Sequence, residues 1–182
     1  MTQAALITPT LTSEEQTRVD AIFADVEQKM GFIPDGLKLY STSPPLLEAF
    51  LGNIGYFMAH PSIRQELLAT IRFLVASKSE CNFCIDFNEA LLSNLGVDTA
   101  AVREARNNPD KAPLPDKEKA LLKEILKTLD NPGNMTAETL QNLKALGWTE
   151  REVFEALLVG SNNRSFSTML KAFNVETQGA FA

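Results

Sequence analysis

The chain has 182 residues, of which 45% are hydrophobic and 22% charged, and its formal net charge is −6. This length suffices for a domain with its own hydrophobic core, while the acidic balance and the lack of any Lys/Arg run argue against nucleic-acid binding. No stretch approaches the roughly 18 consecutive apolar residues of a membrane span, and the N-terminus lacks the basic and apolar regions of a signal peptide, so we expect a cytoplasmic protein without membrane contact.

Helical periodicity dominates the N-terminal half, and no convincing alternating strand is present. A helix is predicted over residues 12–31, because Thr12 and Glu15 have the spacing of a capping box. A loop rich in Gly and Pro follows, and the next helix is predicted to begin at Ser43 and Pro44.

The central part of the chain predicts three further helices. Ser62 and Gln65 form a second capping box ahead of an amphipathic helix over residues 62–78. Residues 84–96 read as a helix closed by a glycine, and a short helix follows near residue 98.

The C-terminal half predicts helices over residues 115–130, 135–147 and 149–175. Gly160 and a polar run interrupt the apolar face of the last helix, so we expect a kink or a packing seam there. The two halves of the chain share a loose plan of a Pro-marked loop followed by paired helices. We therefore predict an all-α fold with two related helical halves, forming one domain over residues 1–182 with an N-terminal arm at 1–11.

The two cysteines of the chain, Cys81 and Cys84, form a C-x-x-C pair in the segment "SECNFCIDFN". Ser79 is predicted to cap the helix that follows, which would put both cysteines in its first turns, on one face. A helix N-terminus stabilises a thiolate, so we expect a lowered thiol pKa and a reactive dithiol. In such a pair one cysteine attacks a disulfide or a peroxide and the other resolves the intermediate.

Other uses of the cysteine pair fit the sequence less well. Zinc prefers four ligands, whereas this chain offers one pair and a single histidine, His60, so we expect no metal and no other cofactor. A structural disulfide is not expected in a reducing cytoplasm. An inert, buried pair of cysteines stays open as an alternative.

Two longer segments, "GFIPDGLKLYSTSPPLLEAF" and "ELLATIRFLVASKSECNFCIDFN", carry a resemblance to a known family. They resemble the carboxymuconolactone decarboxylase family, and more closely its alkylhydroperoxidase D-like, peroxidase-related branch. The resemblance extends from about Thr12 to Val175. It implies a homo-oligomeric helical fold, a trimer or a hexamer, and an antioxidant oxidoreductase of peroxiredoxin-type activity. Such an enzyme would reduce alkyl hydroperoxides or disulfides through the C-x-x-C pair and be restored by a thiol electron donor.

The same resemblance assigns roles to individual residues. By position, Cys84 matches the peroxidatic cysteine and Cys81 the resolving one. The histidine that the family usually has four residues after the second cysteine is replaced by Asn88, and the glutamate twelve residues before the first cysteine by Ala69. Asn88 can orient a thiolate or a water but cannot change charge near neutral pH.

The altered positions leave the proton relay without its usual acid and base. Glu66, one turn earlier than Ala69 on the same helix, is a candidate substitute, and Glu80, adjacent to Cys81, is a weaker one. His60 lies outside the matched motif, beside a proline, and is expected in a surface turn.

Two other functions stay open at this point. One is a decarboxylase of the carboxymuconolactone type, which would need basic groups for a dicarboxylate; Arg72 is the obvious one on the central helix. The other is a non-catalytic oligomeric scaffold with redox-sensitive cysteines.

Overall fold

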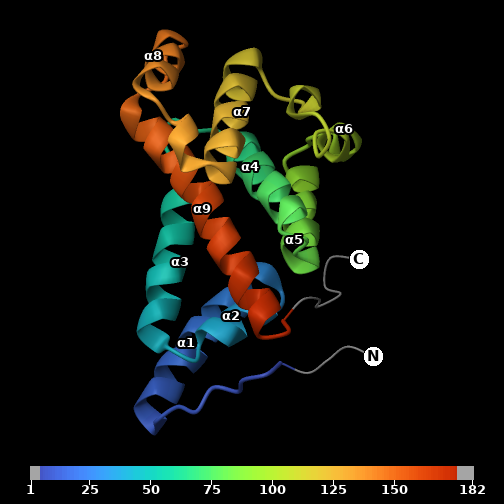
Figure 1. The fold of residues 1–182 in the computed structure, drawn as a ribbon. Helices are drawn as coiled ribbons and strands as arrows, with labels where there is room; N and C mark the ends of the chain where they lie inside the picture. The colour runs from blue at the N-terminus through green and yellow to red at the C-terminus, as the bar shows by residue number, and fades with distance from the viewer. Residues whose placement is uncertain (1–4, 176–182) are drawn as a thin grey trace. The chain divides into compact units, whose positions relative to one another are not determined.

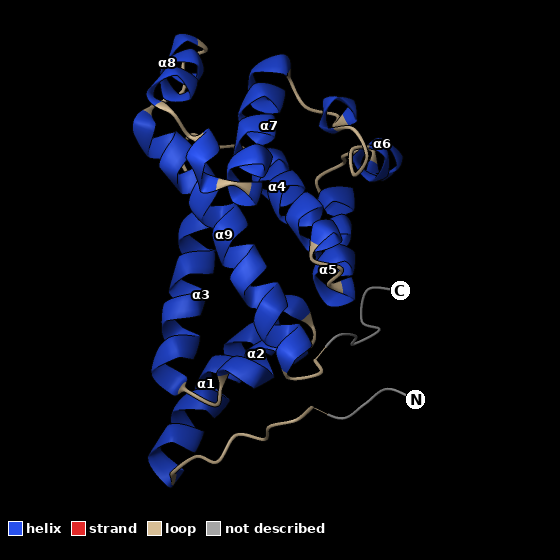
Figure 2. Cartoon of the chain, in the orientation of Figure 1, coloured by secondary structure: helices blue, strands red, loops and turns tan. Residues whose placement is uncertain are grey.

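The computed structural model describes residues 5–175, and these residues form helices, turns and loops without any strand (Figures 1 and 2). The predicted all-α fold is confirmed. In chain order the helices are α1 (Ser13–Met30), α2 (Asp35–Tyr40), α3 (Pro44–Met58), α4 (Gln65–Lys78), α5 (Asn82–Asn94), α6 (Thr99–Glu104), η1 (Pro109–Lys111), α7 (Asp116–Asp130), η2 (Pro132–Asn134), α8 (Ala137–Ala145) and α9 (Glu150–Ala172). No helix within residues 5–175 combines the length and apolar character needed to cross a bilayer.

The described residues divide into two compact units. One contains residues 5–59 and 169–175, and the other contains residues 60–168. The cysteines and every other candidate site residue belong to the second unit. The boundaries of a single domain over residues 1–182 stay a prediction, and residues 1–4 and 176–182 lie outside the described part.

The first unit packs α1, α2 and α3 around a small apolar core. Val19, Val26, Leu37 and Leu47 are buried at its centre. The predicted capping box is present, because Thr12 Oγ1 accepts from the amide of Glu15 while the Glu15 carboxylate accepts from the amide of Thr12. The described part of the N-terminal arm has no regular secondary structure, and its Leu6 amide donates to the Phe173 carbonyl at 3.0 Å.

The second unit is built on α4, a helix buried nearly all round. From Leu67 to Ala76 every residue except Arg72 is buried. A helix that is apolar on all faces needs neighbours on all faces, and α4 contacts α5 most extensively and α7 as well. The burial of α4 explains why Arg72, the one charged side chain between Leu67 and Ala76, stands out.

Helix α9 runs without interruption past Gly160, so the expected irregularity is a packing seam and not a break in the helix. A Cβ atom at Gly160 would lie 2.6 Å from Leu129 Cδ1 of α7 and 3.4 Å from Ile71 Cγ2 of α4. Glycine therefore lets α9 approach both neighbours closely. The capping box predicted at the start of α9 is present, since Thr149 and Glu152 exchange backbone-to-side-chain hydrogen bonds.

Two predicted caps are wrong. Helix α4 begins at Gln65, not at Ser62, because the amides of Ser62 and Ile63 donate to the ring of His60. Ser79 does not cap α5 but is the C-cap residue of α4, and Cys81 is the N-cap residue of α5.

The turn between α4 and α5 is a Schellman motif with an unusual residue at its left-handed position. The Cys81 amide donates to the Ala76 carbonyl and the Glu80 amide to the Ser77 carbonyl, which is the hydrogen-bond pattern of that motif. Glu80 has φ 52°, where glycine is usual. This turn puts Cys81 directly at the start of α5.

Candidate active site

The two cysteines lie together at the beginning of α5, as predicted. Cys81 is the N-cap residue and Cys84 lies in the first turn, and neither cysteine is in a disulfide. Both are buried, Cys81 with 0% and Cys84 with 2% of its surface exposed. Both thiols therefore lie in a desolvated environment.

Cys84 has a hydrogen-bond partner from a distant part of the chain. Ser167 of α9, itself 0% exposed, donates its hydroxyl to Cys84 Sγ at 3.4 Å. The hydrogen bond with Cys81 raises the pKa of Cys84 most, burial raises it further, and the Ser167 hydroxyl acts in the opposite direction. The prediction of a lowered thiol pKa is thus wrong for Cys84, because holding a proton between two buried sulfurs outweighs the helix N-terminus.

Asn88 supports the backbone of Cys84. Its Nδ2 donates to the Cys84 carbonyl at 2.7 Å, and its Oδ1 accepts from Arg72 Nε at 3.0 Å. Asn88 is 2% exposed. Its side chain therefore links the buried face of α4 to the first turn of α5, and both ends of the amide are used in that link.

Arg72 is partly buried, and burial lowers the pKa of Arg72 to about 10. The guanidinium is still cationic at neutral pH. Ala69, the position at which the family usually has a glutamate, is fully buried one turn away on α4. The structure thus places a cation, not a carboxylate, on the α4 face next to Asn88.

An aromatic cluster joins α5 and α9, the helices that carry Cys84 and Ser167. Phe83 of α5 stacks with Phe87 at a centroid distance of 6.2 Å and contacts Phe166 of α9 at 6.3 Å. Phe83 is buried, whereas Phe87 and Phe166 are partly exposed. Since Phe166 adjoins Ser167, the cluster supplies apolar surface beside the Cys84–Ser167 pair.

Glu66 is engaged away from the thiols. It forms an ion pair with Arg64 at 2.7 Å, and this interaction lowers the pKa of Glu66. A helix rises about 1.5 Å per residue, so Glu66 lies about 9 Å from Arg72 along α4, toward the end of the helix opposite the cysteines. The structure does not bring Glu66 to Cys84, and a catalytic role for it stays a prediction.

Glu80 adjoins Cys81 in sequence, but its side chain is exposed. The left-handed backbone at Glu80 is explained by the Schellman turn alone. Its assignment as a weaker relay candidate stays a prediction.

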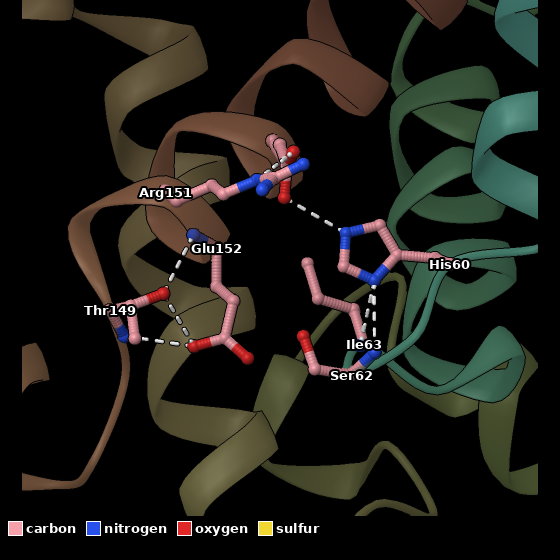
Figure 3. Close-up of polar contacts among 7 residues, drawn as sticks. His60, Ser62, Ile63, Thr149, Arg151 and Glu152 are labelled. Carbon is pink, nitrogen blue, oxygen red and sulfur yellow. Dashed lines mark hydrogen bonds and ion pairs between the residues drawn. The ribbon is translucent and has the colours of Figure 1, made fainter.

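His60 is not a surface residue, contrary to expectation. Its Nε2 lies 2.8 Å from Glu155 Oε2, and the side chains of His60 and Glu155 are only 2% and 8% exposed. Figure 3 shows Nδ1 of the ring facing the amides of Ser62 and Ile63, so Nε2 carries the proton that is donated to Glu155. Arg151 Nε donates to the other oxygen of the same carboxylate at 2.9 Å.

The His60–Glu155 pair is distinct from the cysteine site. Glu155 precedes Ser167 by twelve residues on α9, which corresponds to about 18 Å along the helix axis. The pair closes the turn before α4 onto α9 and has a structural role in the second unit. Within the described residues, no group of three or more His, Cys, Asp or Glu side chains is arranged to hold a metal ion.

Sequence reasoning missed Ser167 and the Arg72–Asn88 link. The polar run "GSNNRSFST" in α9 was a signal for polar contacts between helices, but it could not indicate which hydroxyl reaches a sulfur. Asn88 was singled out correctly as a residue beside Cys84, although its contact is with the backbone and not with the sulfur.

Comparison with known proteins locates this fold among peroxidase-related structures. No protein-family model and no curated protein matches the sequence. An uncharacterized peroxidase-related protein from Silicibacter sp. TM1040 superposes with a TM-score of 0.85 at 17% identity, over 97% of this chain and 93% of that one. An alkylhydroperoxidase AhpD core protein from Ralstonia eutropha JMP134, also described as an uncharacterized peroxidase-related protein, gives 0.85 at 14% identity, over 98% and 95%.

A third solved structure has a different printed activity. It is a variant of the debrominase Bmp8 in complex with 2,3,4-tribromopyrrole, with a TM-score of 0.74 at 20% identity, over 99% of this chain and 95% of that one. At these identities the likeness concerns the fold, which is that of the AhpD-like, peroxidase-related proteins. The AhpD-like helical fold implied by the resemblance is therefore confirmed.

Proposed function

We propose that this protein is a dithiol oxidoreductase that reduces hydroperoxides, with Cys84 as the attacking residue and Cys81 as the resolving residue. The observation that carries the proposal is the arrangement at the start of α5, where the Cys84 thiol is hydrogen-bonded to Cys81 and receives the Ser167 hydroxyl. A hydroperoxide can oxidise such a dithiol without a further proton donor from the protein, because the singly ionised pair retains one proton. The AhpD-like, peroxidase-related fold supports the proposal.

The first chemical step uses the singly ionised pair. When the proton that the pair shares lies on Cys81, the Cys84 thiolate attacks the terminal oxygen of the hydroperoxide, the O–O bond breaks, and Cys84 becomes a sulfenic acid. The leaving alkoxide needs a proton, and Cys81, which shares the one proton that the pair retains, is positioned to give it. The coupled dithiol thereby replaces the histidine that is absent at Asn88.

The second step closes the disulfide. Loss of its proton makes Cys81 a thiolate, which attacks the sulfur of the Cys84 sulfenic acid and releases hydroxide, which takes up a proton to form water. The sum is dithiol plus hydroperoxide giving disulfide, alcohol and water. An external dithiol then exchanges with the disulfide and restores both thiols.

The polar groups around Cys84 assist these two reaction steps in different ways. Ser167 donates to the sulfur and stabilises the thiolate form, because a hydrogen bond to the charged form favours it. Asn88 fixes the carbonyl of Cys84 and, with Arg72, holds the first turn of α5 in place. Neither Ser167 nor Asn88 titrates near neutral pH. Ser167 therefore acts by stabilising charge and Asn88 by orienting the backbone.

Steady-state turnover tests the proposed function. Purified protein is supplied with dithiothreitol as the external dithiol and with cumene hydroperoxide, and alcohol formation is followed by chromatography. We expect catalytic turnover that is lost in Cys84→Ser, since a hydroxyl is a far weaker nucleophile than a thiolate. Turnover in Cys84→Ser equal to that of the wild type would overturn the proposal. The same assay with 2,3,4-tribromopyrrole in place of the hydroperoxide examines debromination as the competing activity.

The homo-oligomer, a trimer or a hexamer, also remains a proposal that rests on the family resemblance. Sedimentation velocity at micromolar concentration tests it, and a stable monomer would contradict it.

A further inference from the structure

Arg72 is the exception among the seven arginines of the chain. The other six each have a carboxylate oxygen within 4.0 Å: Arg18, Arg64, Arg103, Arg106, Arg151 and Arg164. Within residues 5–175, Arg72 makes one hydrogen bond, from its Nε to Asn88, and its two Nη atoms have no partner. Its terminal donors are therefore available to another molecule.

The position of this unpaired cation is unfavourable unless an anion compensates it. Arg72 projects from the most buried helix of the second unit, and burial is the cause that lowers its pKa. A desolvated charge without a counter-charge is costly, and a planar guanidinium with free donors matches the two oxygens of a carboxylate. Because Arg72 is only partly buried, its terminal donors are not sealed from solvent.

The guanidinium is also linked to the backbone of the candidate nucleophile. Arg72 reaches Asn88 through one hydrogen bond, and Asn88 reaches the Cys84 carbonyl through the next. On the α5 and α9 side, the aromatic cluster of Phe83, Phe87 and Phe166 provides apolar surface. The helices around Cys84 thus carry one cation without a carboxylate partner and a cluster of aromatic side chains.

We propose that Arg72 binds the carboxylate of the substrate, and that the substrate class is a small aromatic acid that carries the reducible group. The inference rests on the proposed function for its chemistry, but the binding step does not require the cysteines to react. Arg72 would anchor the acid, and the apolar body would lie against the phenylalanine side chains. The reducible O–O bond would then be held near Cys84.

Binding of an inert probe tests the inference separately from turnover. The probe is 4-isopropylbenzoate, which contains no reducible bond, and its neutral match is 4-isopropylbenzamide; calorimetry gives both dissociation constants. We expect the benzoate to bind the wild type at least tenfold more tightly than the amide, as charge-assisted hydrogen bonds imply. Arg72→Gln should remove that preference, while Arg103→Gln, which alters an exposed arginine, should keep it.

Kinetics with a matched pair of hydroperoxides gives the second readout. Cumene hydroperoxide and its para-carboxylate derivative differ only in the anion. We expect Arg72→Gln to lower kcat/KM for the carboxylate about ten- to a hundredfold, mainly through KM, and to lower it much less for the neutral compound. An equal loss for both would show that Arg72 acts only through Asn88 and would overturn the inference.

The two proposals can fail independently. Preferential benzoate binding without any hydroperoxide turnover would contradict the proposed function and leave the anion site standing. Turnover of both hydroperoxides with no difference in binding between benzoate and benzamide would contradict the anion site and leave the dithiol chemistry standing.

Discussion

Ser167 Oγ lies 3.4 Å from Cys84 Sγ, although 83 residues separate them in the sequence. The contact joins the C-terminal part of α9 to the first turn of α5, and both residues are buried. The Ser167 hydroxyl stabilises the Cys84 thiolate and so lowers the pKa of Cys84, whereas the hydrogen bond with Cys81 and burial raise that pKa. A hydroxyl on one helix thus tunes a thiol on another.

Ser167→Ala should slow the reaction of Cys84 with peroxide about five- to tenfold, because a net hydrogen bond is worth about 1 kcal/mol. The donated hydrogen bond lowers the pKa of Cys84, so its loss should also move the alkaline rise of the rate to higher pH. Stopped-flow rates from pH 6 to pH 10 measure both effects. Ser167→Thr, which keeps the hydroxyl, and Ser165→Ala, an exposed serine on the same helix, are the controls. A wild-type pH profile in Ser167→Ala would contradict the assigned role.

Glu80→Gly should stabilise the protein by about 1 kcal/mol, because a left-handed conformation costs an L-residue roughly 1–2 kcal/mol and glycine none, while glycine loses some entropy. Thermal unfolding measures the gain as a higher Tm. Glu80→Ala is the matched control and should give no such gain, since alanine keeps the strain. Hydroperoxide turnover of Glu80→Gly should match the wild type, and a large loss would instead support Glu80 as a relay residue.

His60→Ala should destabilise the protein by about 2–3 kcal/mol, because one oxygen of the buried Glu155 carboxylate loses its hydrogen bond from the ring while Arg151 still contacts the other oxygen. Two backbone amides before α4 also lose their acceptor. Denaturant unfolding measures the change. Lys29→Ala, which breaks an exposed pair with Asp25, should change stability by no more than about 0.5 kcal/mol. A similarly small effect at His60 would refute the structural role.

Glu118→Gln should stabilise the protein at pH 7 and have little effect below about pH 4.5. Burial raises the pKa of Glu118, with Arg64 at 3.5 Å acting against it. The folded state therefore favours the protonated acid, and stability is lost as the pH rises from 4.5 through the raised pKa. Glutamine is neutral throughout, and Glu118 Oε2 is buried without a hydrogen bond. Tm values of both proteins from pH 4 to pH 8 test this prediction. A gain in Tm for Glu118→Gln that is largest at low pH would contradict it.

The local features of the fold could be predicted from the sequence. The capping boxes at Thr12 and Thr149 and the helical pairing of Cys81 with Cys84 depend on residues three apart, and the structure has all of them. The end of α4 could not be placed in this way. A Schellman turn usually shows a glycine, and here the left-handed residue is Glu80.

The parts of the site that were missed depend on long-range contacts. His60 reads as a turn residue beside a proline, and its burial follows from Glu155, 95 residues away. The side-chain amide of Asn88 forms hydrogen bonds with Arg72 and with the Cys84 backbone. No sequence pattern predicts these two contacts. Helical periodicity predicts the face of the helix on which a residue lies. It does not predict which side chain of a neighbouring helix that residue contacts.

The measurement that tests the dithiol proposal most directly is mass spectrometry after exposure to one equivalent of cumene hydroperoxide. We predict that the wild type loses two hydrogens as Cys81 and Cys84 join, and that Cys81→Ser stops at a sulfenic acid on Cys84, trapped by dimedone. Cys81→Ser should also form that acid more slowly than the wild type forms its disulfide, because it lacks the thiol proton for the leaving alkoxide. A folded wild-type protein that keeps two free thiols throughout would contradict the proposal.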